Sequence, residues 1–147
     1  MLDEVDRMIL DELRQDASRP VRDIASRLGL RRTTVQYRIE RMRKQGIIRR
    51  VVAIPDYSAV GLPVTAIILV SYSATSSRSQ LDVGEELAKI EGVFEVHVVS
   101  GTWDLIVKVR ATSLQEIGDL VVNRLRKIPG VGQTVTCGCF FTLKEEP

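Results

Sequence analysis

Histidine and cysteine are almost absent from this sequence, and their scarcity excludes two kinds of site. The 147 residues include one histidine, His97, and two cysteines, Cys137 and Cys139. A structural zinc site takes four Cys or His ligands, so we expect no metal and no cofactor. Two cysteines one residue apart on a strand do not readily meet disulfide geometry. They fit packing or a subunit contact, with a redox switch as the alternative, in a reducing cytoplasm.

Long apolar runs are also missing, which excludes a membrane partner. No run approaches the roughly 18–20 residues of a membrane span. The opening stretch MLDEVDRMIL is acidic and has no apolar signal region, so we expect no secretory signal. No Ser/His/Asp, Cys/His or paired-carboxylate set suggests catalysis. His97, between Val96 and Val98, fits a half-exposed strand residue better than a catalyst, and we expect no enzyme.

Charge, in contrast, is abundant and unevenly placed. Residues 1–54 carry 13 basic and 8 acidic side chains, whereas residues 55–147 carry 8 basic and 11 acidic ones. The stretch Arg31–Arg50 alone holds eight basic residues and a single acid, Glu40. A basic excess confined to one part of a chain is typical of nucleic-acid binding. The alternative is a solvated helix surface.

Three short helices are predicted in the first part. One apolar stripe at helical spacing marks the first helix, in Leu2, Val5, Ile9, Leu10 and Leu13. Pro20 suits the first turn of a second helix that ends at Gly29. A third helix is expected over Thr33–Gln45, and the apolar run Ile47–Ile54 reads as a short strand or wing. Residues 55–63, with Pro55, Gly61 and Pro63, look like a linker.

The second part contains an internal repeat. LAKIEGVFEV (87–96) and LRKIPGVGQT (125–134) share L-x-K-I-x-G-V at an offset of 38 residues, and each ends a helix and opens a strand. Strands at Val64–Tyr72 and Leu105–Ala111 precede the two helices. The helices begin at Ser79-x-x-Asp82 and Ser113-x-x-Glu116, the second a capping box. The order β-α-β-β-α-β predicts a ferredoxin-like unit.

This sheet is predicted to need a cover on both faces. Right-handed crossovers place both helices on one face. The strand VTAIILV is apolar on both sides apart from Thr65, so the second face also favours burial. A second copy of the chain provides such a cover and predicts a homodimer built on residues 64–147. The first domain is the alternative cover.

The third helix separates into a core stripe and a possible reading face. On a helical wheel Val35, Ile39 and Met42 share one narrow sector and are predicted to face the core. Arg and Lys neutralise phosphate or pair with guanine, while Gln, Thr and Tyr add hydrogen bonds and apolar contact. The DNA-binding candidates are therefore Arg31, Arg32, Thr33, Thr34, Gln36, Tyr37, Arg38, Arg41, Lys44, Arg49 and Arg50.

The motifs resemble the leucine-responsive regulator/asparagine-regulator family, the feast/famine transcription factors, over almost the whole chain. In the first part they are LD-x-x-D-x-x-IL-x-x-L from Leu2, D-I-A from Asp23, and T-V-x-x-R-I-x-x-M from Thr34. In the second they are V-x-V-V-S-G-T-W-D-L from Val96 and I-P-G-V-x-x-T-x-T from Ile128. Any one motif is weak, but two sets in order at proper spacing are specific.

The resemblance implies an effector site as well as DNA binding. The SGTWD loop is similar to the family's amino-acid site, and the residues implied are Gly101, Thr102, Asp104, Thr134 and Thr136. Another interpretation is structural: Gly101 supplies a positive φ, Asp104 caps the turn and Trp103 packs at a subunit contact. Arg31 departs from the family's Ser at the start of the third helix, and Thr33 is expected to cap it instead.

Together these features predict an α+β protein. It combines a winged helix-turn-helix DNA-binding domain (1–54), a linker (55–63) and a ferredoxin-like assembly and effector-sensing domain (64–147). The expected function is sequence-specific regulation on a pseudo-palindromic double-stranded operator, by a homodimer or higher homo-oligomer that a small amino acid controls. The alternatives are a weakly specific, chromatin-like DNA-bridging protein, or an enzyme resembling the sirohaem decarboxylases. Such an enzyme would want more histidines and arginines than residues 79–147 contain.

Overall fold

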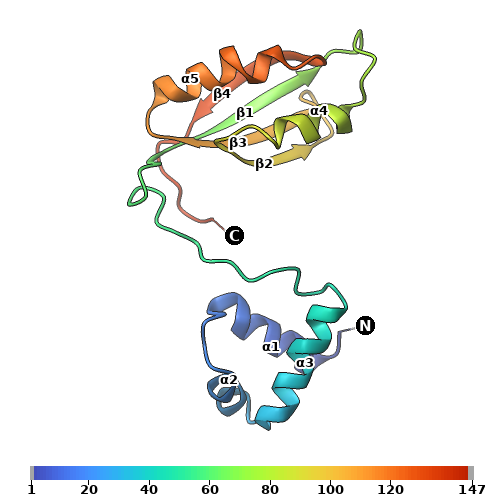
Figure 1. Ribbon diagram of the computed structural model, residues 1–147, viewed down its shortest axis with the longest axis vertical. Helices are drawn as coiled ribbons and strands as arrows, with labels where there is room; N and C mark the ends of the chain where they lie inside the picture. The colour runs from blue at the N-terminus through green and yellow to red at the C-terminus, as the bar shows by residue number, and fades with distance from the viewer. Residues whose placement is uncertain (1, 146–147) are drawn as a thin grey trace. The chain divides into compact units, whose positions relative to one another are not determined.

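The computed structural model describes residues 2–145 (Figure 1). The chain divides into two compact units, one that ends at Ala53 and one that begins at Ile54. Each unit has its own hydrophobic core. The α+β class and the helix-turn-helix followed by a ferredoxin-like sheet are confirmed.

The first unit consists of three helices. α1 (Glu4–Gln15) begins at a capping box, in which the Asp3 and Asp6 side chains each accept the other's backbone N–H. α2 (Val21–Leu28) follows Pro20 and ends at Gly29, whose left-handed φ of 66° turns the chain into α3 (Arg32–Lys44). The predicted core stripe of α3 is confirmed, because the core comprises Ile9, Ile24, Ala25, Val35, Ile39 and Met42.

The strand or wing predicted over Ile47–Ile54 is wrong as a strand. Among residues 2–145, strands form only in the second unit. Ile47 and Ile48 pack against the first core, and both backbone N–H groups donate to the Met42 carbonyl after the turn at Gly46. The following residues are exposed, Val51 by 54% and Ile54 by 57%. The segment finds no neighbouring strand to pair with, so its backbone remains irregular.

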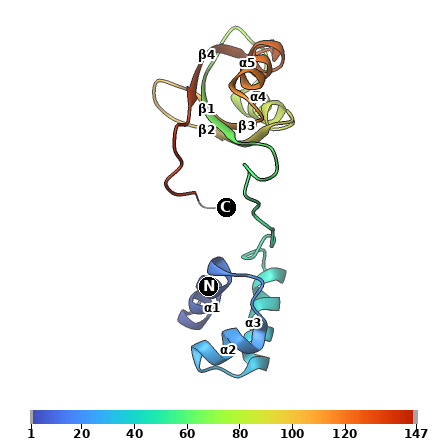
Figure 2. The same cartoon turned by 90° about the vertical axis from the view of Figure 1, so that its left-hand side faces the viewer.

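The second unit is a four-stranded antiparallel sheet in the order β2-β3-β1-β4. The strands are β1 (Val64–Tyr72), β2 (Val93–Val98), β3 (Leu105–Ala111) and β4 (Val131–Gly138). The helices are α4 (Gln80–Leu87), α5 (Leu114–Asn123) and a short turn η1 (Leu125–Lys127). The predicted ranges of β1 and β3 are confirmed. Both long helices cover the same face of the sheet (Figure 2).

The strand register assigns each side chain to a face. Ile68, Val70 and Val107 point toward the helices and are fully buried. Their neighbours Leu69 and Ile106 pair across the strands on the opposite face, which we call the open face, and are only half-buried. The core of the unit therefore lies between the sheet and its helices.

The helix caps of this unit differ from the sequence prediction. At α4, Ser79 and Asp82 exchange both bonds of a capping box. At α5, Ser113 accepts the Glu116 N–H, but the Glu116 carboxylate bonds the backbone and hydroxyl of Thr112 instead. The capping box therefore belongs to the first helix and not to the second. One residue of difference in reach decides which backbone N–H the carboxylate satisfies.

Candidate functional site

The exposed side of α3 carries polar side chains suited to a DNA groove. Tyr37 is 65% exposed. Thr33, Gln36 and Lys44 are exposed, and Thr34 is half-buried. Gln36 donates to Glu40 at 2.8 Å, one helical turn along. Because the opposite side of α3 is fixed in the core, this side is free to enter a major groove, which admits an α-helix.

The start of α3 is positively charged and has no side-chain cap. Arg31 occupies the N-cap position in an extended conformation, and the helix begins at Arg32. The prediction that Thr33 caps the helix is therefore wrong. No acidic residue lies in the first turn. Uncapped N–H groups, the helix dipole and two exposed arginines together favour an anion such as a backbone phosphate.

Arg38 and Arg41 have a different environment from the rest of the α3 candidates. Arg38 pairs with Asp3 at 2.5 Å and with Asp6 at 2.9 Å, and Arg41 pairs with the other Asp6 oxygen. Asp6 is fully buried, while the arginine side chains are 21% and 32% exposed. We call this set of four residues the α1–α3 clamp. It ties α3 to α1, so neither guanidinium is a free member of the exposed face.

The electrostatics of the clamp agree with its geometry. The hydrogen bond from Arg38, helped by the Asp6 backbone N–H, lowers the pKa of Asp3 to about 2. The same bond, followed by that to Asp6, raises the pKa of Arg38. All these groups are charged at neutral pH. A fully buried carboxylate is stable only when such partners replace its water.

Arg49 and Arg50 lie beyond α3, in the irregular segment described above, and are exposed. Their position follows the helix C-terminus by five and six residues. They are available to phosphate but have no fixed geometry that would select a base.

The SGTWD loop joins β2 to β3 and is anchored by Asp104. One carboxylate oxygen accepts the Tyr72 backbone N–H at 2.7 Å and the other accepts the Gln80 amide at 2.9 Å. The Asp104 backbone N–H donates to the Val70 carbonyl at 3.0 Å. Gly101 has a φ of 122°, which an L-residue rarely adopts. Asp104 therefore holds the loop against β1 and α4, with neutral donors on both oxygens.

A shallow hollow lies beside this loop on the open face. Its volume is about 690 Å³, and its lining comprises Leu69, Val98, Val99, Ser100, Thr102, Trp103 and Ile106. Thr102 thus faces a space that an apolar side chain can fill. The lining mixes backbone polar groups with an aromatic ring, which is common for small-ligand sites.

Thr134 and Thr136 lie apart from the loop within one copy. On β4 they pair with Val70 and Ile68, so they share the helix-covered side of the sheet. β1 separates β4 from β3, which carries the loop at its start. A single chain therefore gathers Gly101, Thr102 and Asp104 but not the two threonines.

Sequence reasoning missed Asp3 and Asp6 as determinants of the α3 surface. Their partners lie 32 to 35 residues away along the chain. A helical wheel of α3 alone cannot include them. The available signal was the acid at the fourth helical spacing in LDEVD, one member of which is set beside the apolar stripe.

Two searches of residues 2–145 gave negative findings. No group of three or more His, Cys, Asp or Glu side chains is arranged to hold a metal ion there. No helix in that range is long and apolar enough to cross a membrane. His97 is exposed and Cys137 and Cys139 are exposed free thiols.

Two family profiles match the chain. The AsnC-type helix-turn-helix domain matches residues 2–43, and the Lrp/AsnC ligand binding domain matches residues 65–147. An uncharacterized HTH-type transcriptional regulator from Pyrococcus horikoshii is 47% identical over 99% of this chain and 97% of its own.

Solved structures share the fold over the whole chain. A feast or famine regulatory protein from M. tuberculosis, complexed with L-methionine, is 27% identical with a TM-score of 0.90, covering 99% of this chain and 97% of that one. A transcriptional regulator from Neisseria meningitidis, also in an L-methionine complex, is 20% identical with a TM-score of 0.91, covering 99% and 94%. This last likeness concerns the fold alone.

Proposed function

The chain belongs to the Lrp/AsnC family of transcriptional regulators, and from this premise we propose that α3 reads operator DNA. It has an AsnC-type helix-turn-helix and an Lrp/AsnC ligand-binding domain. The observation that carries the proposal is the division of α3. Its core stripe and the α1–α3 clamp fix the helix, while Tyr37 and its polar neighbours stay exposed.

The residues divide into readers and phosphate contacts. Thr33, Thr34, Gln36, Tyr37 and Lys44 form the exposed set that reads base edges. Arg31 and Arg32 at the uncapped helix start, with Arg49 and Arg50 after the helix, contact phosphates. Arg38 and Arg41 act through the clamp, by setting the angle at which α3 is presented.

We propose a homodimer, or a higher homo-oligomer, formed through residues 64–147. The support is the open face, where Leu69 and Ile106 are only half-buried and Val135 is 43% exposed. Two-fold symmetry requires a pseudo-palindromic operator with half-sites about one helical turn, or ~34 Å, apart. In this division of labour residues 1–54 bind DNA, 55–63 link, and 64–147 assemble and sense.

We further propose that a small amino acid binds beside the SGTWD loop and changes assembly. The hollow lined by Thr102 and Trp103 offers space, and Gly101 allows close approach of backbone N–H groups. Asp104 positions the loop. Thr134 and Thr136 join such a site only through a neighbouring copy. The amino-acid complexes of two structural relatives support the ligand class.

Selection from random DNA tests the proposal. Bound sequences are sequenced with and without each of the common amino acids. We expect an enriched pseudo-palindrome and one or more amino acids that change its recovery. If nothing is enriched and binding falls smoothly with salt, sequence-specific regulation is wrong.

A DNA-bridging protein of low specificity is the second candidate. The uncapped, arginine-rich start of α3 favours it, because phosphate contacts carry no sequence information. The salt dependence separates the two. Arg32→Ala reduces the slope of log affinity against log salt by about one on any DNA, whereas Tyr37→Ala affects only the enriched sequence. Equal effects of both variants on all sequences would favour bridging.

A further inference from the structure

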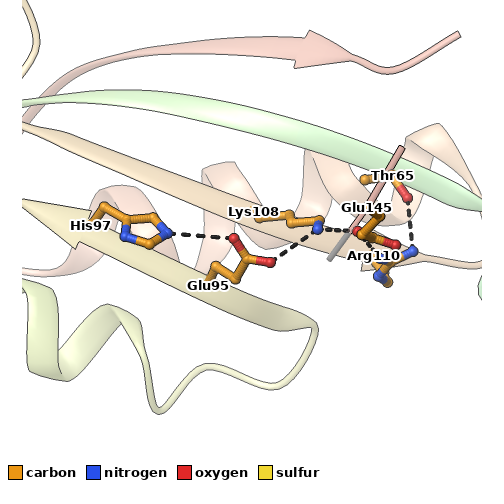
Figure 3. A network of polar contacts seen from close by, with 6 residues as sticks. All are labelled: Thr65, Glu95, His97, Lys108, Arg110 and Glu145. Carbon is orange, nitrogen blue, oxygen red and sulfur yellow. Dashed lines mark hydrogen bonds and ion pairs between the residues drawn. The ribbon is translucent and has the colours of Figure 1, made fainter. Parts of the chain in front are cut away.

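The open face of the sheet carries a chain of charged groups that neither the DNA nor the amino-acid proposal uses. It runs from Glu95 on β2 through Lys108 and Arg110 on β3 to Glu145 (Figure 3). Lys108 bonds Glu95 at 3.0 Å and also bonds Glu145, and Arg110 bonds the same Glu145 oxygen at 2.5 Å. Two cations on one strand thus converge on a single carboxylate.

Arg110 is held in a built site. It is 8% exposed, and its guanidinium stacks over the Tyr57 ring at 3.6 Å. Tyr57 in turn meets the edge of Phe94 with ring centroids 5.2 Å apart. Thr65 accepts a further guanidinium N–H at 3.3 Å. The buried Arg110 Nε has no hydrogen-bond partner, so the site has a donor to spare.

The carboxylate that fills this site comes from a weakly held segment. Residues 139–145 follow β4 and form no helix or strand. Phe140 is 95% exposed, Phe141 88% and Leu143 98%. Apart from the Cys139 N–H bond to the Thr65 carbonyl, the printed geometry ties the segment down through Glu145. A hollow of about 480 Å³ separates the segment from Tyr57 and Arg110.

We propose that Lys108 and Arg110 form a carboxylate-binding site that Glu145 fills, and that a free carboxylate with an aromatic body can take it over. Two buried cations demand an anion, and a guanidinium fork matches a carboxylate. The rings of Tyr57 and Phe94 favour a flat apolar body beside the charged head. Displacement then releases the 139–145 segment. The site is distinct from the SGTWD loop and does not depend on DNA binding.

Charge accounting around the site supports an exchangeable anion. Glu95 on β2 neutralises one of the two cations, and His97 is its only other partner on that strand. Bonds from Lys108 and Arg110 lower the pKa of Glu145, so it is ionised at neutral pH. Without Glu145 or a substitute, Arg110 would be a buried cation with no acid beside it.

Limited proteolysis of the full chain tests the site. Chymotrypsin cleaves after Phe140 and Phe141 only when the segment is released, and mass spectrometry identifies the products. Glu145→Gln should increase this cleavage about fivefold. The matched control Glu85→Gln removes an exposed carboxylate of α4 and should leave the rate unchanged. Equal rates for wild type and Glu145→Gln would overturn the latch.

The ligand class is tested with sodium benzoate against benzamide and sodium chloride at matched ionic strength. Each rate is normalised to a free peptide substrate in the same solution. Benzoate should raise cleavage of the wild type about as far as Glu145→Gln does, while benzamide and chloride should not. Lys108→Met keeps the stem but removes the charge, and it should abolish the benzoate effect, as should Arg110→Met if it folds. A benzoate effect no larger than that of chloride, or one that persists in Lys108→Met, would overturn the proposal.

Discussion

The two units of this protein use the same ionic arrangement for different ends. In each, two cations two or three residues apart meet an acid more than 30 residues away: Arg38 and Arg41 meet Asp6, and Lys108 and Arg110 meet Glu145. Asp6 is fully buried in a helix, whereas Glu145 is 30% exposed in an irregular segment. The element that supplies the carboxylate decides whether the pair is a fixed support or an exchangeable latch.

The largest expected effect comes from the fixed pair. Asp6→Asn leaves two arginines facing a neutral group and should lower the free energy of unfolding of the first unit by about 3 kcal/mol. Hydrogen exchange of the α1–α3 amides measures it without interference from the second unit. Asp11→Asn is the matched control on the same helix, because its pair with Arg14 is exposed on both sides. It should cost less than about 0.5 kcal/mol. Equal losses would erase the distinction between the two arrangements.

Within α3, the comparison predicts that neighbours one turn apart behave differently. Tyr37→Ala should weaken operator binding about tenfold while exchange protection of the helices is unchanged. Arg41→Ala should weaken both, because it leaves Asp6 with one partner fewer. Affinity by fluorescence anisotropy and hydrogen exchange are measured on the same samples. If Arg41→Ala is as stable as the wild type, the guanidinium belongs to the reading face after all.

A third acid sharpens the comparison, because Asp104 has only neutral donors. Asp104→Asn keeps the shape but replaces one acceptor by a donor facing either the Tyr72 N–H or the Gln80 amide. We expect a loss of about 1 kcal/mol in the second unit and loss of the amino-acid effect on assembly. Light scattering with and without the selected amino acid reports the assembly. An intact response in Asp104→Asn would separate the loop from the sensor.

The smallest expected effect is a pH dependence of the latch. The pKa of Glu145 lies below its ordinary value, so its contact is complete above that ordinary value and is lost as pH falls through the lowered one. Exchange protection of residues 139–145, corrected for the intrinsic rate, should therefore fall between pH 6 and pH 2.5 while α4 and α5 stay protected. The Asp3 pair with Arg38, with a pKa of about 2, should persist over most of that range. Simultaneous loss of both would point to acid unfolding of the whole chain.

Local patterns in the sequence were enough to predict the elements that their own residues define. The ranges of β1 and β3 and the stripe of Val35, Ile39 and Met42 follow from periodicity, which depends only on neighbours along the chain. The strand over Ile47–Ile54 failed because apolar, β-branched residues describe a tendency, whereas a strand needs a partner.

The site was less predictable because its decisive contacts are tertiary. Nothing near Arg41 in the sequence indicates that Asp6 binds it, and nothing near Asp104 indicates Gln80. Thr134 and Thr136 came from a family resemblance, and the strand order places β1 between them and the loop. Similarly, the alternation of Lys108 and Arg110 on β3 gave no hint of Glu145. Such partners emerge only from the folded arrangement.

The strand order also has a consequence for synthesis of the chain on the ribosome. β1 is central, yet it is the first strand to be made, and its neighbours β3 and β4 follow about 35 and 60 residues later. Until then the apolar run VTAIILV is an unpaired strand open on both edges, the kind of segment that aggregates. The helical unit, whose contacts are local, can fold before this stage. The interval before β3 emerges is therefore when a nascent chain most needs a chaperone.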